Sequence, residues 1–114
     1  MNDTEKFMRA QEHYLQYNDK ASWDIMFLCV YKACGVALKK YIQRNNLPHL
    51  FRDEFHYRQI DATNAIMARY LKPKGYRIKY IATVARNSAF DIMTRRKTRE
   101  VEELEKITVH YVVR

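Results

Sequence analysis

Residues 22–41, SWDIMFLCVYKACGVALKKY, indicate which class of fold this chain adopts. Apolar residues recur there at steps of three and four, which is the spacing of one face of an α-helix. The residues of this stripe are Trp23, Met26, Phe27, Val30, Cys34, Ala37, Leu38 and Tyr41. We expect Ser22 to cap the helix at its start, and Asn45, Asn46 and Pro48 to end it. The pattern predicts a long helix with one side in a core.

Three other segments are predicted to be helical. The first covers about residues 4–17, and the third covers residues 60–71, starting at residue 60 or 61. The fourth begins near Tyr76, and the charged residues up to residue 106 can extend it. Its apolar stripe consists of Ile78, Ile81, Val84, Ala85, Ser88, Ala89 and Ile92. We expect this stripe to pack against the stripe of residues 22–41.

The chain contains few of the residues that make tight turns. It has two glycines and two prolines among 114 residues, whereas a β-sandwich or barrel needs more of both. Residues 107–114 alternate and are β-branched, as in a strand, but a lone strand needs a partner. We therefore predict an all-α protein, a compact three- to four-helix bundle over residues 1–106. A C-terminal tail, residues 107–114, follows as a short strand or a disordered segment.

The two cysteines and the start of the chain favour a reduced, cytosolic setting. Cys29 and Cys34 are five residues apart on one predicted helix, about 140° apart around its axis. Since this arrangement is poor for a mutual disulfide, we expect both to be reduced core residues. The first residues are polar and lack the apolar segment of a signal peptide. No apolar run is expected to reach the length that spans a membrane.

The sequence offers no pattern of a catalytic or metal site. The four histidines are scattered, and none has the spacing of a zinc ligand pair. Two glycines are too few for a phosphate-binding loop. The acidic residues between positions 100 and 105 follow a run of basic ones, as on a solvated helix face. We expect neither enzymatic activity nor a cofactor, a metal ion or a small-molecule substrate.

Positive charge is concentrated in the second half of the chain. The net charge is +8, but the stretch from Arg69 to Arg99 alone holds ten basic residues and one acid, Asp91. A local excess of this size favours a polyanionic partner, either nucleic acid or an anionic membrane. The basic residues are mostly arginines and alternate with tyrosine and asparagine. This composition favours nucleic acid over a membrane surface.

Residues 76–99, YRIKYIATVARNSAFDIMTRRKTR, resemble region two of bacterial sigma factors of the major class. The matching positions are Ala85-Arg86-Asn87, Ala89, Asp91 and Arg95-Arg96-Lys97. In looser form, the resemblance covers about residues 22–100. The Gln-Glu pair of the family's polymerase-binding helix is Asn64-Ala65 here. The resemblance implies the helical region-two fold as a stand-alone module without the C-terminal helix-turn-helix.

The resemblance also implies which residues bind DNA and which bind RNA polymerase. The expected DNA-binding residues are Arg77, Lys79, Tyr80, Arg86, Asn87, Arg95, Arg96 and Lys97. Their cations can neutralise phosphates, and Asn87 can hydrogen-bond a base edge. The candidates for stacking on unpaired bases are Tyr76, Tyr80 and Phe90, of which Tyr76 and Phe90 also fit as core residues. We expect the two tyrosines to lie one turn apart on the fourth helix. The expected polymerase-binding residues are Asp61, Asn64 and Arg69.

Three functions remain open at this point. The first is a sigma-like transcription module that binds RNA polymerase core, melted promoter DNA or both, and so directs or modulates initiation. The second is an adaptor or decoy that occupies the polymerase without reading DNA. The third is a generic basic helical DNA-binding protein. The resemblance implies that the protein, whether cellular or from a phage, acts in the cytoplasm of a bacterium. The expected partners are DNA and bacterial RNA polymerase core, and no membrane is expected as a partner.

Overall fold

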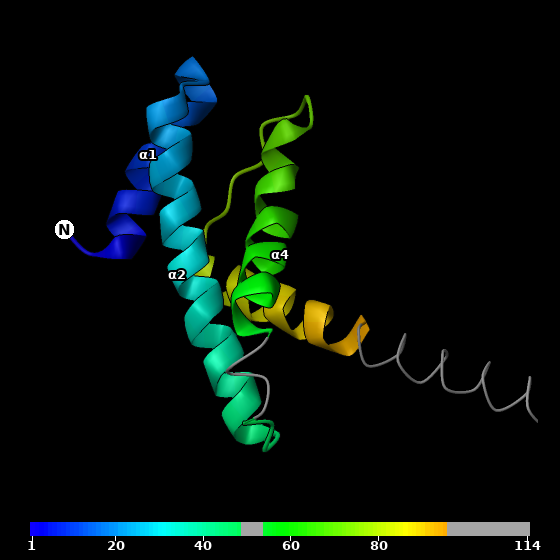
Figure 1. Ribbon diagram of the computed structural model, residues 1–114. Coiled ribbons are helices and arrows are strands. Elements are labelled where there is room, and N and C mark those ends of the chain that lie inside the picture. Colours follow the sequence, from blue (N-terminus) through cyan, green and yellow to red (C-terminus); the bar gives the residue numbers. More distant parts are fainter. Residues whose placement is uncertain (49–53, 96–114) are drawn as a thin grey trace, which may run out of the picture.

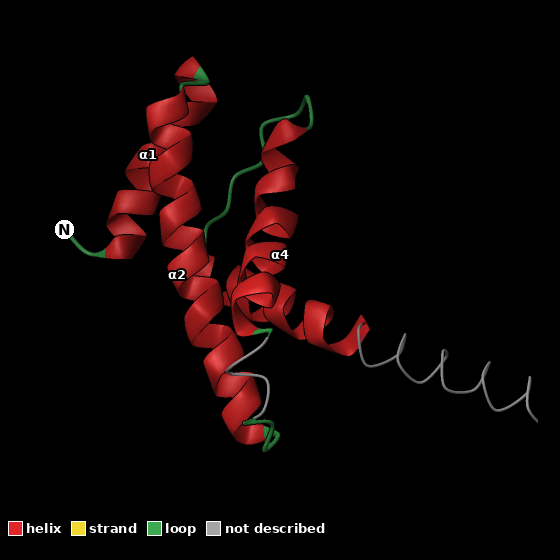
Figure 2. Ribbon diagram, viewed as in Figure 1, coloured by secondary structure: helices red, strands yellow, loops and turns green. Residues whose placement is uncertain are grey.

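Helices make up most of the described part of the chain, as Figure 2 shows. The computed structural model describes residues 1–48 and 54–95. These contain α1 (Asp3–Tyr17), α2 (Lys20–Arg44), α4 (Phe55–Met67), the 3-10 helix η1 (Ala68–Leu71) and a further helix over residues 81–95. No described residue lies in a strand. The prediction of an all-α fold is therefore confirmed.

A short turn joins α1 to α2, and the two helices lie side by side and antiparallel (Figure 1). Asn18 ends α1 in the left-handed conformation, with φ at 53°, and its N–H donates to the Tyr14 carbonyl at 2.7 Å. Asp19 then caps α2, since its carboxylate accepts the Ser22 N–H at 2.9 Å. The prediction that Ser22 is the cap was wrong by three residues. Asp19 is an equally good capping residue, and it lies earlier in the chain.

α4 begins at Phe55, whereas the sequence predicted a start at residue 60 or 61. The earlier turns bury two polar side chains, Arg58 and Gln59, which a search for apolar spacing passes over. Arg58 pairs with the Glu54 carboxylate at 2.5 Å, and Gln59 donates to the Tyr31 carbonyl at 2.8 Å. Because these bonds satisfy the buried groups, the helix extends over residues 55–59, ahead of its predicted start.

The core consists of two clusters of buried apolar side chains. The larger one joins α1, α2, α4, η1, the segment before residue 81 and the start of the 81–95 helix. Its residues are Phe7, Ala10, Met26, Cys29, Val30, Cys34, Ala62, Ile66, Met67, Tyr70, Ile78, Ile81 and Ala85. The smaller one packs Leu38 and Ile42 of α2 against Ala89 and Met93. The predicted contact between the two apolar stripes is thus confirmed. Cys29 and Cys34 are buried and free.

By length and composition, α2 is apolar enough to cross a membrane, contrary to the sequence-based expectation. Within the described residues it is the one helix of this kind, with a mean hydropathy of 1.4 over its most apolar window. In the folded molecule, 33% of that window is buried. The core helix of a soluble protein has the same properties. The feature is therefore weak support for a membrane span.

Some predictions concern residues outside the described part of the chain. These are the extension of the fourth helix to residue 106, the tail 107–114 with its boundary, and the assignments of Arg96 and Lys97 to DNA binding. They stay predictions. The start of the fourth helix, by contrast, lies within the described residues and forms part of the candidate site.

Candidate nucleic-acid interface

A buried glutamine of α1 holds the segment that leads into the 81–95 helix. The Gln11 side chain is 1% exposed, donates to the Ile78 carbonyl at 3.0 Å and accepts the Ile78 N–H at 2.7 Å. The Tyr70 hydroxyl also donates to the Gln11 Oε1. Burial raises the pKa of Tyr70, so this hydroxyl remains a neutral donor. Because both backbone groups of Ile78 pair with Gln11, the helix begins at residue 81, and the predicted start near Tyr76 was wrong.

Two exposed tyrosines on this segment each have a cation over the ring. Tyr76 is 44% exposed and Tyr80 is 65% exposed. The Arg69 guanidinium lies 5.9 Å from the centre of the Tyr76 ring, and the Lys79 ammonium lies 5.6 Å from that of Tyr80. Both distances are typical of cation–π pairs. The prediction that the tyrosines lie one turn apart on the fourth helix was wrong, because both precede that helix.

Arg77 lies between these tyrosines in sequence, but an acidic side chain of α1 already contacts it. Its guanidinium donates to the Glu12 carboxylate, in an ion pair whose side chains are 63% and 53% exposed. Exposed pairs of this kind contribute little stability, because water and salt screen them. The Arg77 guanidinium can therefore leave the Glu12 carboxylate and bind a phosphate instead.

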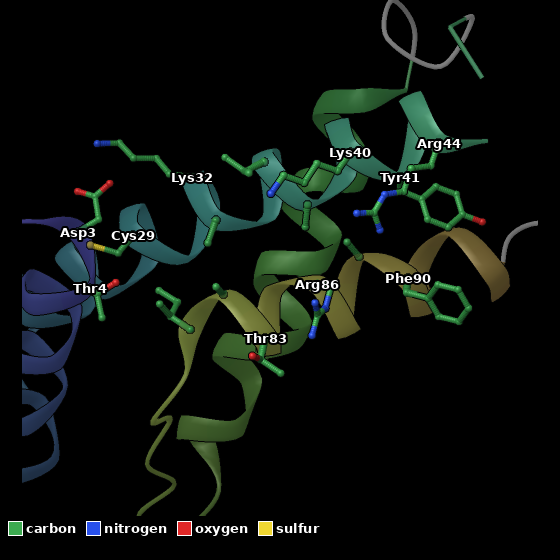
Figure 3. Close-up of a pocket in the computed structure, with 16 residues that line it drawn as sticks. Asp3, Thr4, Cys29, Lys32, Lys40, Tyr41, Arg44, Thr83, Arg86 and Phe90 are labelled. Atoms are coloured by element: carbon green, nitrogen blue, oxygen red, sulfur yellow. The ribbon is translucent and has the colours of Figure 1, made fainter. Parts of the chain in front are cut away.

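A groove of about 530 Å³ runs between α2 and the 81–95 helix (Figure 3). Four cationic side chains line it, namely Lys32, Lys40, Arg44 and Arg86. Within the described residues, Asp3 is the one carboxylate that lines the groove. Of the predicted DNA-binding residues, Arg86 is in this lining. The lining of the groove therefore carries a net positive charge, which suits an anionic ligand.

Phe90 and Tyr41 face each other across one end of the groove, and Asp3 and Thr4 lie at the other end (Figure 3). The two rings meet edge to face, with centres 6.1 Å apart and planes at 74°. The sequence left open whether Phe90 is a core residue or a platform for stacking on bases. Because its side chain is 55% exposed, Phe90 is not a core residue. Its ring is available to a ligand.

α2 supplies several groups to this site that the sequence analysis did not assign to it. Tyr41 was predicted to belong to the core stripe, and it does pack against the smaller core cluster, but it is half-buried and also lines the groove. Lys40 and Arg44 were not among the predicted DNA-binding residues. Their concentration near the C-terminal end of α2 was the available signal. A basic helix end also suits the helix dipole, so the signal alone was ambiguous.

The structure does not bring all the predicted DNA-binding residues onto one surface. Asn87 is exposed beside the groove but does not line it. Arg95 is also exposed, nine residues after Arg86, which places it about half a turn away around the helix axis. Arg86 and Phe90 therefore face the groove, and Arg95 points to another side of the helix.

The predicted polymerase-binding residues lie on two different elements. Asp61 and Asn64 are exposed on α4, one turn apart. Arg69 is exposed on η1, and its guanidinium covers Tyr76. Arg69 therefore belongs with the aromatic segment, and Asp61 and Asn64 form a separate exposed face of α4.

Comparison of the chain with protein-family models, curated proteins and solved structures gave no match. Among the described residues, no group of three or more histidine, cysteine, aspartate or glutamate side chains is arranged to hold a metal ion. The groups that this site offers to a ligand are its own charges and rings.

Proposed function

We propose that this protein binds single-stranded or melted DNA, as a sigma-like module that also engages RNA polymerase core and directs or modulates transcription initiation. One observation carries the proposal. The aromatic rings of Tyr76, Tyr80 and Phe90 are exposed, and each lies close to cationic side chains. An exposed ring can stack on an unpaired base, and a neighbouring cation can neutralise its phosphate.

Duplex DNA makes little use of exposed rings. Its bases are already stacked inside the helix, and a basic surface alone is sufficient to bind its phosphates. Unpaired bases gain about 1–3 kcal/mol each from an aromatic platform. Exposed rings among cations therefore favour single strands over duplexes, and they favour the sigma-like function over a generic basic helix.

The resemblance to sigma region two supports the polymerase part of the proposal. Arg86 lines the groove, and it lies in the block where that resemblance is strongest. Asp61 and Asn64 stand exposed on α4, beside the exposed ring of Tyr57. This face has no role in the core, so it is available to a protein partner.

An adaptor or decoy that binds polymerase without reading DNA is the second candidate. The ion pair between Arg77 and Glu12 is compatible with it, because DNA must displace Glu12 before it reaches this cation. The exposed face of α4 would serve such a protein equally well.

The test is to replace Tyr80 by alanine and to measure binding of a fluorescent oligonucleotide, single-stranded and duplex, by anisotropy. We expect single-strand affinity to fall about fivefold or more, since one stacked base contributes ~1 kcal/mol or more. Duplex affinity and the melting temperature should barely change, because Tyr80 is exposed. Tyr57→Ala is the matched control, since it removes an exposed tyrosine of α4 and should leave both affinities unchanged.

Equal losses for single strands and duplexes would overturn the stacking role of Tyr80. Absence of single-strand binding in the unmodified protein, together with its co-purification with RNA polymerase core, would favour the adaptor instead. Failure of both assays would overturn the sigma-like function altogether.

A further inference from the structure

We infer that the groove between α2 and the 81–95 helix is the path of a single nucleic-acid strand, with α2 providing most of its phosphate contacts. This inference rests on the proposed function and specifies its binding site. It moves the main electrostatic contacts from the basic second half of the sequence to α2, which the sequence analysis assigned to the core.

The spacing of the cations along α2 fits a polymer better than a mononucleotide. Lys32, Lys40 and Arg44 all line the groove. Lys32 and Arg44 are twelve residues apart on one helix, which corresponds to about 18 Å along its axis. A row of charges of this length exceeds one nucleotide and matches several successive phosphates. Arg86 adds a cation from the opposite wall.

The floor of the groove allows flat groups to approach closely. Its lining includes the small side chains of Ala33, Ala37, Ala82 and Ala89. These leave the space between the helices open, and they are apolar, as the faces of bases are. Phe90 and Tyr41 stand at one end and offer an aromatic edge and face to a base that enters there.

The two ends of the groove differ in charge. Arg44 and Phe90 lie at one end, and the Asp3 carboxylate lies at the other, near Lys32 (Figure 3). Because a carboxylate repels phosphate, we expect the tightest phosphate contacts at the Arg44 end. The excess of cations over carboxylates thus selects a polyanion.

The groove is continuous with the tyrosine segment. The Tyr80 carbonyl accepts the Val84 N–H at 3.1 Å, so Tyr80 sits at the first turn of the 81–95 helix. Thr83, three residues later, already lines the groove. A strand stacked on Tyr80 can therefore continue into the groove along the same helix.

The test compares two neighbouring lysines of α2. Lys40 lines the groove, whereas Lys39 is exposed and does not line it. The oligonucleotide affinity of the Lys40→Ala, Arg44→Ala double variant is measured over a series of salt concentrations. We expect the slope of log affinity against log salt to flatten by about 1.4, at roughly 0.7 per lost phosphate contact. Lys39→Ala should leave the slope unchanged. Equal flattening by Lys39→Ala would overturn the inference, because it would indicate a diffuse charge effect.

A second measurement does not depend on the variants folding. A bromodeoxyuridine-substituted single strand is photo-crosslinked to the unmodified protein, and the modified residues are mapped by mass spectrometry. We expect crosslinks at Tyr41 or Phe90. Crosslinks confined to Tyr76 and Tyr80 would overturn the groove as the path while leaving single-strand binding intact. Absence of any crosslink, with no single-strand binding by anisotropy, would overturn the proposed function itself.

Discussion

Replacing Gln11 by alanine removes the side chain that fixes the tyrosine segment to α1. Three buried groups then lose their partner, namely the N–H and the carbonyl of Ile78 and the hydroxyl of Tyr70. An unsatisfied buried polar group costs about 1–3 kcal/mol. Water that enters the space left by the amide can rehydrate these groups in part, so the lower end of this range applies to each of them. The three groups together then cost about 3 kcal/mol or slightly more. We expect Gln11→Ala to lower the free energy of unfolding by about 3–4 kcal/mol.

This loss is large for a single domain. Small proteins unfold with a free energy of about 5–15 kcal/mol, so the variant stays folded with a much smaller margin. The melting temperature should fall by more than about 10 °C. The assay is urea unfolding followed by circular dichroism, with the denaturant slope checked for constancy. In addition, hydrogen exchange should show the Ile78 amide protected in the unmodified protein and unprotected in the variant.

Two further variants separate hydrogen bonding from packing. Gln11→Met fills most of the space but leaves the same three groups unpaired, so it should be nearly as destabilising as alanine. Gln16→Ala changes an exposed glutamine of the same helix and should alter stability by less than about 0.5 kcal/mol. A loss below 1 kcal/mol for Gln11→Ala, comparable to that control, would refute the reasoning.

Three other predictions follow from individual contacts. Hydrogen bonds from the Ser22 N–H and from His13 outweigh desolvation and lower the pKa of Asp19 from 3.8 to about 2. Its charged form therefore stabilises the protein above pH 3.8, and this contribution is lost as the pH falls towards 2. Acid unfolding should show a weaker pH dependence in Asp19→Asn, which keeps a capping side chain. Burial raises the pKa of the Cys34 thiol to about 11, so this thiol should react with a disulfide reagent only after the protein unfolds. Thiol titration with and without denaturant will test this. Glu12→Gln should release Arg77 and steepen the salt dependence of DNA binding by up to about 0.7; an unchanged slope would mean that Arg77 makes no phosphate contact.

The sequence predicted the fold well where apolar side chains recur at a helical spacing. α1, α2 and most of α4 were located by this spacing, and the packing of Leu38 against Ala89 was expected from the two stripes, whereas their neighbours Ile42 and Met93 were not in the predicted stripes. The errors lie where polar groups decide the backbone. Asp19 caps α2 before Ser22, and Arg58 and Gln59 are buried with their own partners. Such partners come from distant parts of the chain, and local spacing does not show them.

The candidate site was only partly predictable for the same reason. Local pattern was sufficient to expect Tyr80 to be exposed, and Arg86 does line the groove. The start of the last helix was misplaced because Gln11, 67 residues away in sequence from Ile78, takes both backbone groups of that residue. The role of α2 depends on which of its faces meets the 81–95 helix. Only the packed structure determines that.

The most direct test of the central claim compares the affinity of the unmodified protein for one oligonucleotide as a single strand and as a duplex, at the same salt concentration. Exposed rings among cations contribute to binding only when bases are unpaired. We therefore predict tighter binding of the single strand, with a preference that persists as salt is raised, because stacking is not screened. Equal binding of the two forms, or a preference for the duplex, would contradict the account and leave a generic basic surface in its place.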